Sequence, residues 1–271
     1  MISTQCGKSV WTRLLACALL FYTHCLALHA AETIHACVAD LEYPPYLYTQ
    51  HDAKSERLVG LGVDVLQFSL KKSGKPAAQI QKLPWLRCLK LTELGEIDLI
   101  INVPTAQIAP QPYRISNPYA IVHSVYITSR INSPRGLKIR TVEDLNRYRI
   151  CGLLGVRYDS YGIDTNKVDT GSNNYISLVN KLQANHCDLF LEKREIIDAL
   201  LARSPELKAA FSSASLMQTA LPEDSPIDLH FAVSRAIPNS QTLVDALNTG
   251  ISILQSTKEM DKWISSYFAP N

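Results

Sequence analysis

The sequence predicts the α/β fold class, arranged as two lobes that are each built from βαβ units. Short apolar segments of strand length alternate with amphipathic segments of helical length, an order that favours mostly parallel sheets with helices on both faces. The alternation stops at Ser133-Pro134-Arg135-Gly136 and then starts again, which indicates a second lobe. One more strand-like segment and two amphipathic helices close the chain.

The first unit contains three expected strands and two expected helices. In chain order they are a strand over 34–38, a helix over 63–72, a strand over 80–83, a helix over 85–94 and a strand over 97–103. A strand order of 2-1-3 would place the second helix across the first strand. Residues of the helix over 85–94 would then lie next to residues of the strand over 34–38.

The second unit repeats this pattern with fewer segments. Thr141 is expected to cap a helical turn over 142–145, followed by a strand over 148–153, a helix over 175–183 and a strand over 188–191. The closing elements are a strand over 229–233 and helices over 242–254 and 260–267. Apolar residues at helical spacing mark the first of these helices as amphipathic.

The N-terminus has the features of an export signal. Lys8 and Arg13 precede a short apolar run over 14–21, and small residues follow at Ala30 and Ala31. We therefore expect residues 1–30 to be a cleaved signal peptide and the protein to be periplasmic. The alternative is an uncleaved membrane anchor, although the apolar run is too short to span a bilayer.

The charge balance of the expected mature chain argues against a nucleic-acid partner. The full chain has 27 basic and 25 acidic residues, and removing Lys8 and Arg13 leaves 25 of each sign. No basic stripe remains, so binding to nucleic acid is not expected. The remaining length of about 240 residues suits one large domain or two of ordinary size.

Four cysteines remain after the expected cleavage: Cys37, Cys88, Cys151 and Cys187. An even number in an exported protein favours disulfides, and no CxxC or CxxH spacing supports a metal site. Spacing alone allows three pairings. With the strand order 2-1-3, Cys88 can reach Cys37, while the other two lie on strands expected to be neighbours. We therefore expect one bridge in each lobe.

The stretch Asp40-Leu41-Glu42-Tyr43-Pro44-Pro45-Tyr46 directly follows the first expected strand. Two prolines cannot continue a central strand, so the chain must leave the sheet there. Ligands bind at the carboxyl ends of strands in open α/β sheets, and a carboxylate beside two aromatic rings suits a small polar or cationic molecule. The alternative is a surface loop whose tyrosines pack on neighbouring residues.

The order of segments resembles the family 3 extracellular solute-binding proteins, the polar amino-acid receptors of ABC importers. The matching pieces include Asp40-x-x-Tyr43-x-Pro45-Tyr46, Gly60-Leu61-Gly62-Val63-Asp64-Val65, Trp85 ahead of Leu94-Gly95-Glu96-Ile97-Asp98, Ser116-x-Pro118-Tyr119, Glu143-Asp144-Leu145, Cys151-Gly152-Leu153-Leu154-Gly155 and Cys187-Asp188. The resemblance implies a two-lobed periplasmic-binding-protein-like fold. Lobe one would be residues 32–122 plus 232–271, and lobe two residues 123–231, with crossing segments near 122–127 and 228–233.

The resemblance also implies a function without a cofactor or a metal. The lobes would close around a small polar ligand, and a membrane permease of an ABC importer would recognise the closed, monomeric protein. By position, Tyr43 and Trp85 would hold the ligand between two rings, and Asp40 would read a distal cationic group. Asn102 and Thr105 would contact the head of the ligand.

Two departures from the family pattern concern that head group. Pro110 stands near the position of the arginine that clamps a carboxylate, and Lys193 stands where an acid would receive an ammonium group. Glu192 and Glu195 lie close enough to replace that acid. Arg157, expected at the start of a lobe-two helix whose N–H groups favour an anion, and Arg87 are candidates to take over the carboxylate.

We therefore expect a ligand other than a standard α-amino acid, with its charge left open. No nucleophile elbow, Walker loop or HExxH motif is present, so an enzyme is not expected. Two alternatives remain. Some relatives of these receptors are dehydratases, and others report to a sensor without a transporter.

Overall fold

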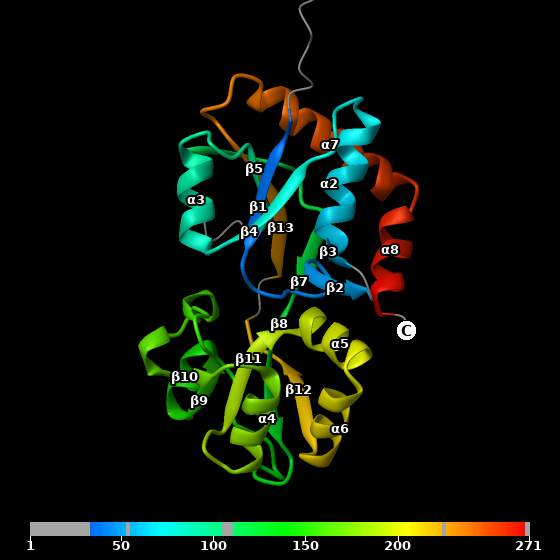
Figure 1. Ribbon diagram of the computed structural model, residues 1–271. Helices are drawn as coiled ribbons and strands as arrows, with labels where there is room; N and C mark the ends of the chain where they lie inside the picture. Colours follow the sequence, from blue (N-terminus) through cyan, green and yellow to red (C-terminus); the bar gives the residue numbers. More distant parts are fainter. Residues whose placement is uncertain (1–32, 53–54, 105–110, 224–225, 269–271) are drawn as a thin grey trace, which may run out of the picture. The chain divides into compact units, whose positions relative to one another are not determined.

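The computed structural model describes residues 33–52, 55–104, 111–223 and 226–268 (Figure 1). They form a six-stranded sheet, a five-stranded sheet and a two-stranded hairpin, with helices packed against the two larger sheets. The expected signal peptide lies outside the described residues. Within those residues, the helices are too short or too polar to cross a bilayer.

The six-stranded sheet, called the first sheet, has the order β4-β1-β5-β13-β6, with β7 also paired to β13. Its strands are β1 (His35–Ala39), β4 (Gln79–Leu83), β5 (Leu99–Pro104), β6 (Tyr113–Ile115), β7 (Ala120–Val122) and β13 (Ile227–Ser234). β4, β1 and β5 are parallel, which confirms the order 2-1-3 expected from the sequence. β13 runs antiparallel to β5.

Helices cover both faces of the first sheet. They are α2 (Leu61–Lys72), α3 (Trp85–Glu93), α7 (Ser240–Ser256) and α8 (Glu259–Phe268). α2 and α7 pack together on one face, where Leu247, Ile251 and Leu254 of α7 are fully buried. α3 covers the other face, as Figure 1 shows. The period of about 3.6 residues per turn places these leucines and isoleucines on one stripe, as expected for an amphipathic helix.

The five-stranded sheet, called the second sheet, has the order β10-β9-β11-β8-β12. Its strands are β8 (Ser124–Ser129), β9 (Ile150–Leu153), β10 (Val168–Ser172), β11 (Leu189–Lys193) and β12 (Leu216–Ala220). One face is covered by α4 (Tyr175–Gln183), α5 (Arg194–Arg203) and α6 (Pro205–Ser213). The other face packs against loops and the 3-10 helices η2 (Val142–Arg147), η3 (Asp159–Tyr161) and η4 (Thr165–Lys167).

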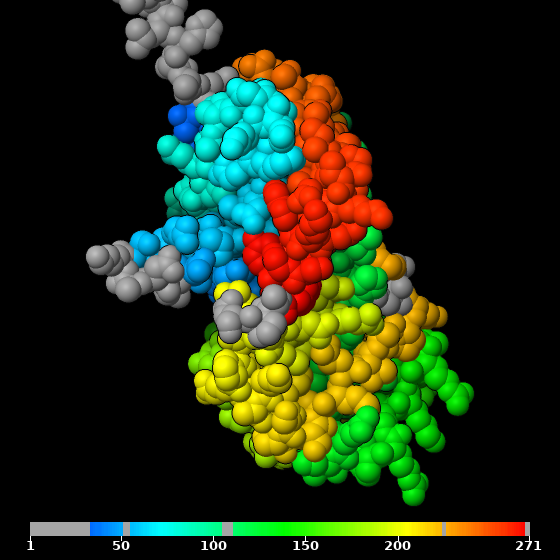
Figure 2. All heavy atoms as spheres, turned by 90° about the vertical axis from the view of Figure 1, so that its right-hand side faces the viewer, coloured from blue at the N-terminus to red at the C-terminus, as the bar shows by residue number. Residues whose placement is uncertain are grey.

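A small hairpin stands outside both sheets. Its strands are β2 (Tyr48–Asp52) and β3 (Ser55–Val59), which the sequence did not reveal. Arg203 of α5 stacks on Tyr48, with the guanidinium carbon 4.0 Å from the ring centroid, and Nη1 donates a hydrogen bond of 3.1 Å to the tyrosine hydroxyl. α5 also contacts the C-terminal helix α8, and the two helices are coloured yellow and red in Figure 2.

The chain passes from the first sheet to the second at His123, between β7 and β8. Glu195, in the first turn of α5, accepts hydrogen bonds from the His123 backbone N–H at 2.9 Å and forms a 2.7 Å contact with its Nδ1. The return occurs between β12 and β13. The expected second crossing over 228–233 is therefore wrong, because these residues pair with β5, β6 and β7 inside the first sheet.

Both expected disulfides are present. Cys37 of β1 is bridged to Cys88 of α3, and Cys151 of β9 is bridged to Cys187, which lies just before β11. All four residues are almost fully buried. Each bridge therefore ties neighbouring elements of one sheet together, as the strand order predicts.

Candidate functional site

The aromatic loop after β1 turns back on itself beside the first sheet. The Tyr43 N–H donates to the Leu47 carbonyl at 2.7 Å, and the Tyr43 and Tyr46 ring centroids are 5.9 Å apart. The Tyr46 hydroxyl donates to the Ile121 carbonyl at 3.3 Å, which ties the loop to β7. Tyr46 is buried, whereas Tyr43 is partly exposed. The tyrosines therefore lie at the carboxyl end of β1, where α/β sheets bind ligands.

Asn102, near the end of β5, has an unsatisfied hydrogen-bond donor. Its backbone N–H donates to the Tyr119 hydroxyl at 3.0 Å, and that hydroxyl donates to Asn102 Oδ1 at 2.5 Å. The amide Nδ2 is then buried without a partner. Asn102 also adopts a left-handed φ of 59°, which is uncommon outside glycine and occurs often at functional sites.

Gly62 of α2 makes this arrangement possible. A Cβ at this position would lie 2.3 Å from Asn102 Oδ1 and 3.0 Å from the Tyr119 hydroxyl. Because both atoms belong to a buried hydrogen-bonded pair, neither can move away without breaking it. The glycine therefore lets the helix approach the side chain that presents the free donor.

Glu192, on β11 of the second sheet, carries a half-buried carboxyl group. Its Oε2 accepts a 2.6 Å hydrogen bond from the Tyr175 hydroxyl, and its Oε1 accepts a 2.8 Å bond from the Lys193 N–H. Burial raises the pKa of Glu192, although both hydrogen bonds and the charge of Lys193 act in the opposite direction. The group therefore lies in a low-dielectric environment with both oxygens already oriented.

Tyrosine rings surround this carboxyl group. The Tyr158 and Tyr161 rings stack with centroids 5.9 Å apart, and the Tyr158 hydroxyl accepts a 2.7 Å hydrogen bond from the Leu153 N–H. The Lys193 ammonium lies 3.9 Å from the Tyr161 ring centroid and donates to Ser124 Oγ at 2.9 Å. This lysine is buried, so its charge is stabilised by the ring face and the hydroxyl.

Acidic groups that follow or end β11 affect the ionisation of a tyrosine in the loop after β1. Burial raises the pKa of Tyr43 well above its ordinary value, and the charges of Glu192 and Glu195 from the second sheet raise it further. Burial also raises the pKa of Tyr175 and of Tyr158, and Glu192 contributes to both shifts. Tyr43 therefore lies within the field of acidic groups on the second sheet, and this field favours a positive charge.

Other residues expected at the site lie elsewhere or have other partners. Asp40 is exposed, and Lys82 Nζ lies 3.7 Å from its Oδ1. Trp85 packs against the cluster that contains the Cys37–Cys88 bridge. Arg87 is exposed on α3. Thr105 and Pro110 lie outside the described residues.

Arg157 does not begin a helix, so that expectation is wrong. The segment after β9 turns at Gly155 and then forms only the short 3-10 helix η3. The Arg157 side chain is 82% exposed, and its Nη2 lies 3.0 Å from Asp159 Oδ2. Only three residues, Asp159–Tyr161, form η3, which is too short to provide the free N–H groups of a helix N-terminus.

Four tyrosines of the site were not identified from the sequence as ligand-binding residues: Tyr119, Tyr158, Tyr161 and Tyr175. Tyr119 belongs to a motif that matched the family pattern, and Tyr175 begins an expected helix. Neither signal reveals that Tyr119 bonds Asn102, that Tyr175 bonds Glu192, or that Tyr158 and Tyr161 stack beside Lys193. Their grouping depends on the pairing of β9 with β11 and on the packing of η3.

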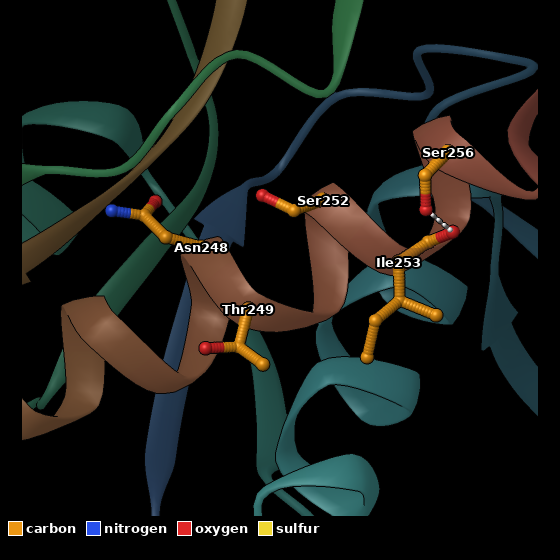
Figure 3. Close-up of a pocket in the computed structure, with 5 residues that line it drawn as sticks. All are labelled: Asn248, Thr249, Ser252, Ile253 and Ser256. Carbon is orange, nitrogen blue, oxygen red and sulfur yellow. Dashed lines mark hydrogen bonds between the residues drawn. The ribbon is translucent and has the colours of Figure 1, made fainter.

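Two surface hollows lie away from these residues. One, of about 510 Å³, is lined by Asn248, Thr249, Ser252, Ile253 and Ser256, all on α7 (Figure 3). The other, of about 690 Å³, lies beside α6 and β12 and includes Arg130, Phe211 and Met217. The first is lined by uncharged residues of one helix, so it cannot enclose a ligand from opposite sides. We therefore place the candidate site at Tyr43, Asn102 and Glu192.

A known family matches nearly the whole described chain. The profile of the bacterial extracellular solute-binding proteins, family 3, matches residues 36–270. No curated protein matches the chain in sequence.

Solved structures share the fold at low identity. The substrate-binding protein AbpA of an amino acid ABC transporter from Streptococcus pneumoniae, bound to L-arginine, is 16% identical, with a TM-score of 0.63 over 87% of this chain and 94% of that chain. A histidine kinase sensor domain with similarity to periplasmic binding proteins is 14% identical, with a TM-score of 0.64 over 87% and 96%. The ancestral amino-acid-binding protein AncCDT-1, a precursor of cyclohexadienyl dehydratase, is 15% identical, with a TM-score of 0.58 over 87% and 95%. At these identities the likeness shows the two-lobed fold.

Proposed function

The chain belongs to the bacterial extracellular solute-binding proteins, family 3, and we propose that it closes its two lobes around a small polar ligand and delivers it to an ABC importer. In this proposal the protein works in the periplasm as a monomer, after removal of residues 1–30. Lobe one carries the first sheet, with the whole of β13, and lobe two carries the second sheet. The membrane permease recognises the closed form.

The observation that supports this proposal best is the position of Tyr43. Tyr43 lies in the loop after β1, beside Tyr46, whose hydroxyl bonds the Ile121 carbonyl close to the hinge residue His123. The charges of Glu192 on β11 and of Glu195 on α5 add to the burial that raises the pKa of its hydroxyl. A ligand at Tyr43 would therefore interact with both lobes. Contacts with both lobes favour the closed state by mass action, which is how a binding protein of this kind reports occupancy.

We propose that Tyr43, Asn102 and Glu192 contact the ligand directly. Asp40, Trp85 and Thr105 complete the site on lobe one, with the two rings of Tyr43 and Trp85 on either side of the ligand. Arg157 has the least support, because its guanidinium is exposed and already paired with Asp159.

A thermal-shift screen against a metabolite library tests the proposal. Binding of one compound at 100 times its Kd should stabilise the native protein by about 2.7 kcal/mol, which raises the melting temperature by several degrees. Tyr43→Ala should reduce that shift. Glu93→Gln, at an exposed residue of α3 that pairs with Lys90, serves as the control and should leave the shift unchanged.

Three outcomes would contradict parts of this proposal. If the library raises no melting temperature, the solute-binding function is wrong. Turnover of a bound cyclic acid would identify an enzyme of the dehydratase kind. Normal uptake in cells lacking the protein, together with loss of a ligand-dependent response, would favour a sensory role over import.

A further inference from the structure

The Glu192 carboxylate is held in place by hydrogen bonds and can still accept more of them. Each of its oxygens accepts one hydrogen bond, one from the Tyr175 hydroxyl and one from the Lys193 backbone N–H. Both donors are neutral groups, and each carboxylate oxygen can accept a second bond. This half-buried carboxylate gains from a cationic donor, because charge-assisted hydrogen bonds are about twice as strong as neutral ones.

The rings near Glu192 suit a cation as well. The Tyr175 hydroxyl donates to Glu192 at 2.6 Å, and the charge of Glu192 also contributes to the raised pKa of Tyr43 and of Tyr158. The neighbouring ring of Tyr161 already has an ammonium group 3.9 Å from its centroid. Aromatic faces attract cations through their quadrupole, so this cluster has the composition of an aromatic cage.

Asn102 offers a hydrogen-bond donor and therefore requires an acceptor on the ligand. Its Nδ2 is buried without a partner, and its orientation follows from the bonds that Tyr119 makes to its other atoms. A buried donor without a partner is costly, and a ligand oxygen would satisfy it. The loop that carries Tyr43 joins the two lobes: the Tyr43 ring lies 5.9 Å from that of Tyr46, the Tyr46 hydroxyl donates to the Ile121 carbonyl, and His123, two residues further on, donates to Glu195 of α5.

Three basic side chains of the described residues that could clamp a carboxylate already have other partners; one is Lys193, whose ammonium donates to Ser124 Oγ at 2.9 Å. Residues 105–110 have the sequence Thr-Ala-Gln-Ile-Ala-Pro, without lysine or arginine. Arg114 Nε donates to Ser240 Oγ at 3.0 Å, and Arg157 pairs with Asp159 on the surface. A buried ligand carboxylate needs a charged partner, and its absence is costly.

We propose that this site selects a small organic cation, a protonated amine that carries a hydrogen-bond-accepting oxygen but no free carboxylate. The proposal rests on the solute-binding function above and names the class of its ligand. Glu192 and the tyrosine rings hold the ammonium group, and Asn102 Nδ2 donates to the oxygen, which belongs to an amide, ester or alcohol.

Calorimetry with matched probes tests the proposal. For glycine, phenylalanine and arginine, the free amino acid, its carboxamide, its N-acetyl acid and the decarboxylated amine are each titrated into the purified protein. At least one carboxamide should bind tenfold or more tightly than its parent amino acid and its N-acetyl acid. The decarboxylated amine, which lacks the oxygen, should bind about tenfold more weakly than the carboxamide. An amino acid or N-acetyl acid that binds as tightly as its carboxamide overturns the proposal.

Two variants assign the contacts. Glu192→Gln should weaken binding of the carboxamide at least tenfold, while Glu93→Gln, an exposed control paired with Lys90 on α3, should change it less than twofold. Asn102→Ala should bring the affinities of the carboxamide and the decarboxylated amine close together. This ratio does not depend on the folded fraction of the variant. Unchanged binding in Glu192→Gln, or an unchanged ratio in Asn102→Ala, contradicts the assignment.

The probes and the metabolite library together distinguish failure of the cation proposal from failure of the solute-binding function. If the metabolite library yields an anionic or neutral ligand, solute binding stands and the cation proposal fails. If neither the probes nor the library bind, the solute-binding function fails as well.

Discussion

Removal of either disulfide should cost several kcal/mol of stability. The bridge between Cys37 and Cys88 closes a sequence separation of 51 residues, and the bridge between Cys151 and Cys187 closes one of 36. The loop-entropy relation gives about 4 kcal/mol for each, with a difference between them of only about 0.3 kcal/mol. Measured losses for native disulfides run from about 2 to 5 kcal/mol, so we expect a similar loss for both double Cys→Ala variants.

Urea unfolding measures this loss. Far-ultraviolet circular dichroism follows both sheets, whereas tryptophan fluorescence follows the first, because Trp85 and Trp263 lie on α3 and α8. With a slope of about 2–3 kcal/mol per molar urea, the loss should lower the midpoint by about 1–2 M. The wild-type chain, reduced in denaturant and compared with its oxidised form, controls for the buried sulfur atoms that alanine removes.

Two results would refute this reasoning. One is a double variant whose unfolding free energy lies within about 0.5 kcal/mol of the wild type, because the loop constraint would then contribute nothing. The other is rapid alkylation of the native, non-reduced protein. Since the four cysteines are almost fully buried and bridged, they should react only after denaturation and reduction.

Three further predictions concern the site and its surroundings. In Gly152→Ala, the new Cβ would lie 2.6 Å from ring atoms of Tyr158. Urea unfolding should show an unfolding free energy lower by about 1–3 kcal/mol because of this overpacking. An unchanged unfolding free energy would mean that the ring can move aside. Arg203→Ala removes the stacking on Tyr48 between α5 and the β2 hairpin and so makes closure of the lobes less favourable. Calorimetry should show ligand binding weakened about two- to fivefold. Equal affinity in the variant and the wild type would exclude a role of this contact in closure. Because burial raises the pKa of Glu192 above its usual 4.5, the native state holds this proton more tightly than the unfolded state. The unfolding free energy should therefore fall as pH rises from 4.5 through the raised pKa, and this slope should disappear in Glu192→Gln; a variant with the wild-type pH profile would show that Glu192 is not the group responsible.

Much of the candidate site could be located from the sequence, but its chemistry could not. The two prolines after β1 mark the point where the chain leaves the sheet, so Tyr43 follows directly from local backbone chemistry. Glu192 was proposed from the family resemblance, as a neighbour of Lys193, which stands where the family has an acid. Its tyrosine neighbours were missed, because residues 158, 161 and 175 are separated by loops whose folding depends on long-range packing. Arg157 was misplaced, because the sequence after Gly155 was read as a helix.

Local sequence patterns predict the α/β class, the strand order of the first sheet and the two disulfides. These features depend on the local periodicity of apolar residues and on the handedness of βαβ crossovers, which short segments encode directly. Long-range packing puts β13 wholly in the first sheet, leaves a free buried donor on Asn102 and brings the Tyr175 hydroxyl to the Glu192 carboxylate. Those features depend on contacts between side chains that are far apart in the sequence and on how burial changes their hydrogen bonding. The spacing of residues along the chain does not predict such contacts.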